Sequence, residues 1–308
     1  MMTLATTLLR YLITIIIASI IIFILIRVIP GDPAAVALGI TATPEAIAQL
    51  QSQLGTDRPL VAQYFSWIAG MLSGDFGTSL SSGQDMSPVI LDRLQVSLIL
   101  VGCSIVLSLV IAVPLGVLAA QRGGAIITAI SQVGIAIPSF LAGILLVSAF
   151  AVRLGWLPAN GWIPPNQDFN GFLQRLILPV LALTAVQAAI LTRYVRSAVV
   201  DVMSEDFMRT ARSKGMSLGR ALRVHGLRNA ALPVLTVTGL QLTTLVIGAV
   251  VIEQVFVIPG IGSMLLESVS NRDLTTVQSI VMLLVVFTLL VNLIIDLLYQ
   301  VLDPRIRR

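Results

Sequence analysis

Six long apolar runs divide this sequence and leave it few ways to fold. They are about 19 to 27 residues long and carry few charges. The runs lie at residues 11–29, 96–119, 126–152, 177–195, 232–251 and 277–298. A helix needs about 20 apolar residues to cross a bilayer, and in lipid only helices and closed barrels satisfy the backbone hydrogen bonds. The runs therefore predict an all-α membrane protein with six transmembrane helices.

Composition supports this class. Of the 308 residues, 56% are hydrophobic and only 11% are charged, less than half of the roughly 25% that is usual for soluble proteins. Cys103 is the only cysteine, which excludes an intrachain disulfide and a cysteine metal cluster. The first run could instead be a cleaved signal, since Ala35-Val36-Ala37 imitates a cleavage site. However, that run exceeds the apolar length of about 7–15 residues that is usual in signal peptides, which favours a retained helix.

The first two runs are separated by a polar segment, residues 30–95, which is rich in Asp, Gly, Pro and Ser. We expect an aqueous loop region here. Thr43-Pro44-Glu45 predicts the start of a helix that continues to about Leu54, because proline suits the first helical position. Residues 60–72 predict a second amphipathic helix, and 74–77 a turn.

Basic residues set the expected orientation. If the N-terminus is cytoplasmic, the segments on that side hold thirteen of the 19 basic residues, as the positive-inside rule requires. Residues 30–95 are then extracytoplasmic, and both termini are cytoplasmic. The net charge of +4 needs no nucleic-acid partner, because positive loops at an anionic membrane surface account for it.

A charged segment between the fourth and fifth runs, residues 201–215, predicts a short cytoplasmic helix. Ser204 is a candidate cap, acidic residues follow it, basic residues occupy the last turn, and Gly215 can end the helix in a left-handed conformation. Met203, Phe207 and Ala211 recur every fourth residue and predict one narrow apolar stripe. This stripe could face the membrane, the rest of the chain or a partner.

The sequence offers little catalytic chemistry. His225 is the only histidine and Lys214 the only lysine, so a two-histidine zinc motif and a phosphate-binding G-x-x-x-x-G-K-[ST] loop are both absent. Ionisable groups of the kind that ion-coupled carriers place at mid-membrane are nearly missing. Asp296 and Glu253 lie toward helix ends. The simpler interpretation of Asp296 is a group that reaches water or pairs with an arginine, rather than one that acts in transport. For Glu253 it is structural hydrogen bonding, although Glu253 could contact substrate or a docking protein. By exclusion, the chain forms a path without its own energy source.

Several motifs resemble the dipeptide, oligopeptide and nickel branch of ABC importer permeases, and the resemblance runs the whole length. The 205–215 segment followed by 225–233 is similar to the cytoplasmic loop signature of that branch. Further matching motifs lie at 30–33, 54–59 with 63–64, 74–79, 137–140, 253–256 with 259–262, and 302–305. A long loop after the first helix is typical of the "B" type, one of two non-identical permeases in such importers.

The resemblance implies a type I ABC importer permease fold in the plasma (inner) membrane. It divides the chain into helix one (1–29), an extracytoplasmic loop region (30–95) and a permease core (96–308) that contains a coupling loop at 197–231. Implied partners are a second homologous permease, two ATP-binding subunits or domains, an extracytoplasmic substrate-binding protein, lipids and a short peptide substrate. The chain itself would bind no cofactor, since ATP and Mg belong to the ATPase subunits.

The same resemblance implies which residues act. The coupling helix would dock on an ATPase subunit through Phe207, Ala211 and Gly215 for shape and through Glu205, Arg209 and Lys214 as polar contacts. The general importer signature has Glu-Ala-Ala where this chain has Arg209-Thr210-Ala211, so the role of Arg209 stays open. Candidate contacts for an outer gate or the binding protein are Glu253, Pro259 and Gly260. Rival interpretations are nickel chelates as substrate, a stand-alone channel or carrier, and a scaffold that only anchors other proteins.

Overall fold

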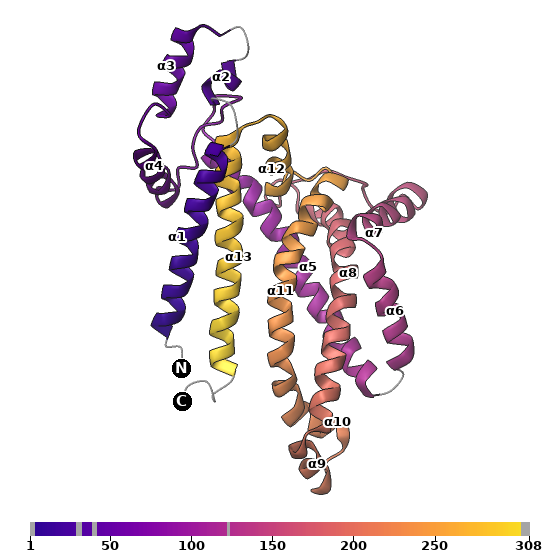
Figure 1. Ribbon diagram of the computed structural model, residues 1–308. Helices are drawn as coiled ribbons and strands as arrows, with labels where there is room; N and C mark the ends of the chain where they lie inside the picture. Colours follow the sequence, from indigo (N-terminus) through magenta and orange to yellow (C-terminus); the bar gives the residue numbers. More distant parts are fainter. Residues whose placement is uncertain (1–3, 29–32, 39–41, 122–123, 303–308) are drawn as a thin grey trace. The chain divides into compact units, whose positions relative to one another are not determined.

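The computed structural model describes residues 4–28, 33–38, 42–121 and 124–302. Within these ranges the chain is helical, and the only β-pairing is a single bridge between Thr78 and Asp85. The helices are α1 (Leu4–Val28), α2 (Pro33–Leu38), α3 (Pro44–Leu54), α4 (Leu60–Ser73), α5 (Ser87–Gln121), α6 (Gly124–Ala136), α7 (Ser139–Leu146), η1 (Val147–Arg153), α8 (Phe169–Ser204), α9 (Asp206–Ser213), α10 (Leu218–Ala221), η2 (Leu222–Gly226), α11 (Leu227–Val255), α12 (Ile261–Ser270) and α13 (Leu274–Leu302) (Figure 1).

Five of the six predicted spans are confirmed as single long helices. Five spans among the described residues are long and apolar enough to cross a membrane. They are α1, α5, α8, the continuous stretch of α10, η2 and α11, and α13. The third predicted span differs, because α6 and the α7–η1 helix meet at an angle of 96°. Pro138 lies at this break with an extended ψ of 145°. The ring of Pro138 and its missing N–H explain why α6 ends here and why the predicted run 126–152 is bent.

The chain folds as two compact units, which differ in extent from the segments expected from the sequence. The core unit comprises Ser97–Pro259 and Val291–Arg308, and the N-terminal unit comprises Met2–Val96 and Gly260–Leu290. Residues 260–290, which include the unpredicted helix α12, thus belong with the polar segment after α1. The motif residues 30–32 and 303–305 lie outside the described residues.

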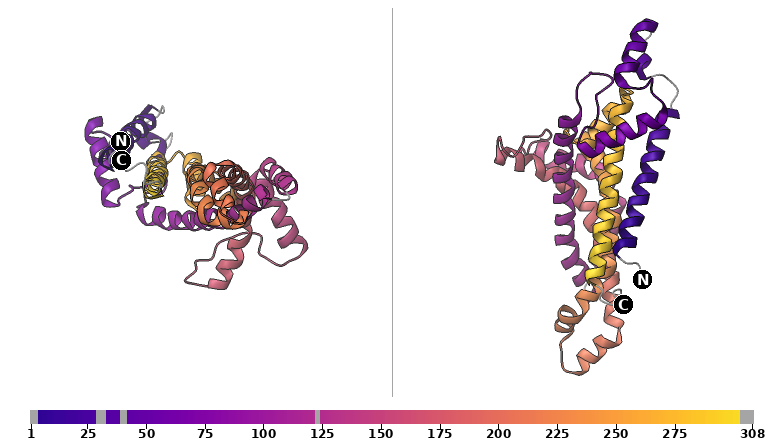
Figure 2. Two further views of the ribbon diagram at one scale, coloured as in Figure 1. Left: turned by 90° about the horizontal axis from the view of Figure 1, so that it is seen from below. Right: turned by 90° about the vertical axis from the view of Figure 1, so that its left-hand side faces the viewer.

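The core unit is built around α8. This helix packs against α6, α7 and α11, and α7 also packs against α11. Figure 2 (left) views the α8–α11 pair from the end at which α9 and α10 lie. A buried apolar cluster at that end joins α8, α9 and η2, and it includes Val199, Val202 and Leu222.

The N-terminal unit joins distant parts of the sequence. Phe76, Ile90, Ile261, Met264 and Ile280 form its buried apolar cluster. The two helices predicted after α1 are confirmed as α3 and α4. In α3 the Thr43 hydroxyl accepts a hydrogen bond from the Ala46 N–H at 3.3 Å, and Gly55 ends the helix with a φ of 68°.

Asp85 hydrogen-bonds to the first residue of α5. Its carboxylate accepts a hydrogen bond from the Ser87 backbone N–H at 2.9 Å. Hydrogen bonds from the Ser87 backbone and hydroxyl lower the pKa of Asp85. Because the pKa of Asp85 is lower in the folded chain than in the unfolded chain, its ionised carboxylate stabilises the fold. This contribution is complete above the unfolded pKa and is lost as the pH falls through the folded pKa.

A buried carboxylate, Asp273, ties the loop before α5 to the start of α13. It accepts hydrogen bonds from the Ser79 hydroxyl at 2.5 Å, the Leu80 N–H at 3.1 Å, and the Thr276 hydroxyl at 2.9 Å and N–H at 3.3 Å. Only 3% of Asp273 is exposed, so its carboxylate is shielded from water. The carboxylate therefore serves as a structural link and as the cap of α13.

We expect Asp273→Asn to lower the free energy of unfolding by about 1–2 kcal/mol, because an amide retains one acceptor oxygen but loses the charge that strengthens each bond. Thermal unfolding of the purified chain in detergent measures the change. Asp92→Asn, at an exposed position on α5, is the matched control and should leave the midpoint unchanged. Equal midpoints for both variants would contradict a structural role for Asp273.

Candidate functional site

The short helix predicted between the fourth and fifth spans is α9. It follows a break at Glu205, where the backbone is extended with φ −68° and ψ 149°. The expected cap residue is wrong, because the Ser204 hydroxyl donates back to the Asp201 carbonyl at 2.7 Å and so belongs to the end of α8. The helix begins at Asp206, and the Met208 N–H donates to the Glu205 carbonyl at 3.0 Å.

One side of α9 is packed against the rest of the core unit. Met208 is completely buried and Ala211 is 7% exposed, and both belong to the apolar cluster with α8 and η2. The expected stripe of Met203, Phe207 and Ala211 is therefore not one continuous surface. At about 100° per residue, the inner face is centred on Met208 and Ala211, and Phe207 lies on its flank. Met208 was missed because the stripe was traced every fourth residue from Met203.

The other side of α9 is open. Phe207 is 37% exposed, and the polar candidates Glu205, Arg209 and Lys214 are also exposed. Arg209 lies 3.4 Å from Asp206, but both side chains are largely in solvent, so this ion pair contributes little to stability. An aromatic ring surrounded by exposed charges on a rigidly seated helix is a typical arrangement for contact with another protein.

The helix ends as the sequence predicts. Gly215 has a φ of 87°, and its N–H donates to the Arg212 carbonyl at 3.0 Å. The next N–H, of Met216, donates to the Ala211 carbonyl at 3.2 Å. This reversal leaves a hollow of about 560 Å³ beside α9, which Arg209, Arg212 and Gly215 line together with Met216, Ser217 and Leu218. Two guanidinium groups therefore border a surface recess.

The second group of candidates lies elsewhere. Glu253, in the last turn of α11, is 1% exposed, and its carboxylate accepts a hydrogen bond from the Ser97 hydroxyl at 2.5 Å. This burial favours the structural interpretation of Glu253 over contact with a docking protein. Pro259 is the last residue of that segment of the core unit, and the Gly260 carbonyl accepts from the Met264 N–H in the first turn of α12.

The described residues contain no cluster of three or more His, Cys, Asp or Glu side chains that could hold a metal ion. The outer side of α9 is open, and its inner side packs against α8 and η2.

Several apolar spans with a short exposed helix between two of them are typical of a membrane transport subunit. The chain belongs to the family described as "Binding-protein-dependent transport system inner membrane component", whose model matches residues 108–308. The N-terminal model of the same membrane component matches residues 2–101. The predicted family and the permease fold are therefore confirmed, and the protein is a multi-pass permease of the ABC importer class.

Curated relatives match over nearly the whole chain. The chain is 38% identical to the "Probable peptide ABC transporter permease protein y4tP" of Sinorhizobium fredii, covering 94% of each chain. It is 39% identical to the "Oligopeptide transport system permease protein AppB" of Bacillus subtilis, covering 92% of each. It is also 39% identical to the "Glutathione transport system permease protein GsiC" of Salmonella choleraesuis, covering 96% of this chain and 95% of the relative.

A solved structure has the same fold. It is titled "Crystal structure of an amino acid ABC transporter with histidines" and matches with a TM-score of 0.54 at 16% identity. The match covers 70% of this chain and 94% of the other. Since so low an identity carries no functional detail, the comparison supports the permease fold alone.

Proposed function

We propose that this chain is the membrane-spanning permease subunit of an ATP-driven importer for short peptides. The observation that carries the proposal is the 37–39% identity, over nearly the full length, to permeases named for peptide, oligopeptide and glutathione transport. Glutathione is itself a tripeptide, so these relatives share one substrate class. The absence of a phosphate-binding loop in the sequence supports a chain that hydrolyses no ATP itself.

The proposed complex contains a second homologous permease, two ATPase subunits that bind ATP and Mg, and an extracytoplasmic substrate-binding protein. In this assembly the open side of α9 docks on an ATPase subunit. Phe207 supplies the apolar contact, and Glu205, Arg209 and Lys214 supply polar contacts, all on exposed positions. Ala211 acts by seating α9 on its own chain, since it is buried there, and Gly215 shapes the recess beside the helix.

Coupling follows from how α9 is attached. Because Met208 and Ala211 pack into a cluster with residues of α8 and η2, α9 cannot be displaced without moving these elements. Closure of the ATPase subunits would thus shift α8 and α11, which pack along each other in the core unit. The path would then open alternately to the two sides of the membrane.

We place α9, α10 and both termini on the cytoplasmic side and residues 30–95 outside, in the plasma (inner) membrane. The segment from 205 to 228 carries five of the 18 arginines and the only lysine, and α9 and α10 lie together at one end of the α8–α11 pair (Figure 1). Positive residues collect on the cytoplasmic side of membrane proteins.

Reconstitution tests the proposal. Proteoliposomes that contain the chain with its second permease, ATPase subunits and binding protein should accumulate a radiolabelled dipeptide when ATP is supplied. Vesicles with this chain alone should accumulate none. ATP-dependent uptake of a nickel chelate but not of peptide would show that the substrate is a nickel chelate instead of a peptide. Uphill transport by the chain alone would overturn the proposal.

A further inference from the structure

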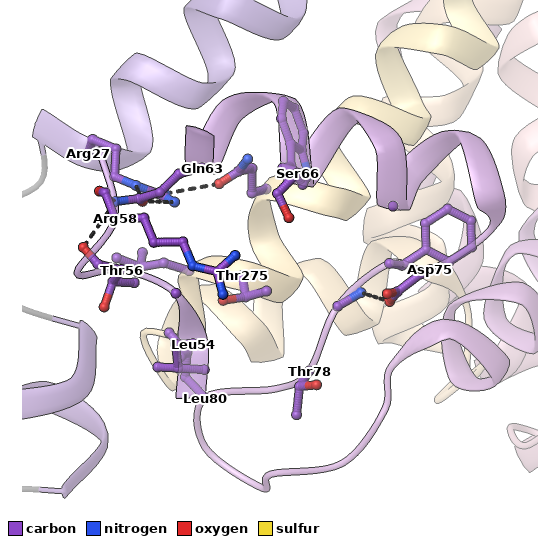
Figure 3. Close-up of a pocket in the computed structure, with 17 residues that line it drawn as sticks. Arg27, Leu54, Thr56, Arg58, Gln63, Ser66, Asp75, Thr78, Leu80 and Thr275 are labelled. Atoms are coloured by element: carbon purple, nitrogen blue, oxygen red, sulfur yellow. Dashed lines mark hydrogen bonds between the residues drawn. The ribbon is translucent and has the colours of Figure 1, made fainter. Parts of the chain in front are cut away.

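The N-terminal unit contains a polar cavity that the transport mechanism above does not use. Its volume is about 340 Å³, within the range of small-ligand sites. The walls come from the end of α1, the α3–α4 loop, α4, the 75–80 loop and the start of α13, all within this one unit (Figure 3). Two arginines and one aspartate line it: Arg27 is half-buried, and Arg58 and Asp75 are exposed.

Arg27 lies in the cavity wall, and among the described residues no carboxylate compensates its charge. Its guanidinium stacks on the Phe23 ring, 4.6 Å from the centroid, and donates to the side-chain oxygens of Gln63 and Gln278 at 3.2–3.3 Å. Both acceptors are neutral amides, and no carboxylate of the described residues forms an ion pair with it. A half-buried guanidinium bonded only to neutral amides keeps its charge, and two of the five N–H groups of Arg27 are left to donate to an anion.

Gln63 holds the second arginine in place. Its amide nitrogen donates to the Thr56 carbonyl at 3.0 Å and to the Arg58 carbonyl at 2.8 Å, while its oxygen accepts from Arg27. The Arg58 side chain lines the same cavity and has no hydrogen-bonding partner among the described residues. Figure 3 shows Arg27, Gln63 and Arg58 gathered at one end of the cavity. The Trp67 indole N–H, also in the lining, is buried and has no hydrogen-bond acceptor among the described residues.

The opposite end of the cavity has the opposite charge. Figure 3 shows Asp75 there, well apart from the arginines, and its carboxylate accepts one hydrogen bond from the Gly77 N–H at 2.9 Å. The remaining oxygen is available to a cation. A simple anion such as phosphate would gain nothing from Asp75, and a metal cation would be repelled by two guanidinium groups. A ligand with a carboxylate at one end and an ammonium at the other uses both ends.

We propose that this cavity binds a short peptide with free ends, with Arg27 and Arg58 holding its carboxylate and Asp75 its α-ammonium group. The inference rests on the proposed peptide substrate and adds a binding site within the permease itself. A guanidinium pair forms charge-assisted, bidentate hydrogen bonds with a carboxylate, so the carboxylate end supplies most of the affinity. The Trp67 N–H provides a further donor inside the cavity.

Equilibrium binding to the full-length chain in nanodiscs, without the substrate-binding protein, tests this site. The probe is L-alanyl-L-alanine, compared with its C-terminal amide, its N-acetyl derivative and inorganic phosphate. The free dipeptide should bind at least tenfold more tightly than the amide. Arg58→Gln should weaken dipeptide binding by at least tenfold, and Asp75→Asn should abolish the preference for the free peptide over the N-acetyl form.

Arg153→Gln, an exposed arginine of the core unit, removes the same charge outside the cavity and is the control. Arg58 is chosen for the test because Arg27 takes part in hydrogen bonds that support the fold. Equal affinity for the dipeptide and its amide, equal competition by phosphate, or full binding by Arg58→Gln would each overturn the site. If the reconstituted importer still takes up peptide while this binding is absent, the cavity inference alone falls and the proposed function stands.

Discussion

Phe207→Glu is expected to reduce peptide uptake by the reconstituted importer at least tenfold while ATP hydrolysis by the purified complex continues. The ring is 37% exposed on α9, next to the anchored Met208, so the substitution changes the surface offered to a partner without opening the apolar cluster. A carboxylate buried at an apolar contact loses its hydration without gaining a partner, and a single aromatic anchor often dominates a protein interface. Uptake and ATPase rates measured on the same preparation would show the loss of coupling.

Two controls separate docking from folding. Phe207→Leu keeps an apolar side chain of similar reach and should retain most of the uptake. Met208→Ala removes a completely buried side chain and should lower the free energy of unfolding. Phe207→Glu should leave the free energy of unfolding within about 0.5 kcal/mol of wild type. Unchanged uptake in Phe207→Glu would count against α9 as the point of attachment.

The sequence predicts much of this fold because lipid imposes a simple length rule. Five of the six apolar runs form single long helices. The helix at 44–54 followed from Thr43 and a proline at the first helical position, and the helix at 60–73 followed from its amphipathic pattern. The angle at Pro138 was not predictable in the same way, since a proline in an apolar run can be accommodated or can break the helix according to its neighbours. Helix α12 was missed because it is only ten residues long and lies between two dominant runs.

The candidate site was predictable in position but only partly in detail. Gly215 was assigned correctly because a left-handed position after a charged last turn has a recognisable pattern. Which residues of α9 face inward depends on the packing partners on α8 and η2. The spacing of apolar residues within α9 does not reveal these partners. Arg27 and Gln63, 36 positions apart, meet only through the tertiary structure. An arginine near the end of an apolar run was the one signal available for that cavity.

Gly116→Val is expected to destabilise the chain by about 3 kcal/mol, because α5 and α8 approach each other at this position with no room for a side chain. A Cβ atom at residue 116 would lie 2.5 Å from the Val195 Cβ and 3.0 Å from the Thr192 carbonyl oxygen. Neither atom is the end of a flexible side chain, so relief requires the two helices to separate. Gly116→Ala should show a smaller loss of the same sign.

Gly102→Ala on the same helix is the matched control, since a Cβ atom there meets nothing within 4 Å. Alanine should leave stability unchanged or raise it by up to about 1 kcal/mol, because it limits the freedom of the unfolded chain. Thermal unfolding in detergent measures both variants, and equal midpoints would show that α5 and α8 are not in close contact at Gly116. Since α8 leads directly into α9, separating α5 from α8 should also lower ATP-driven uptake, and Gly102→Ala should not.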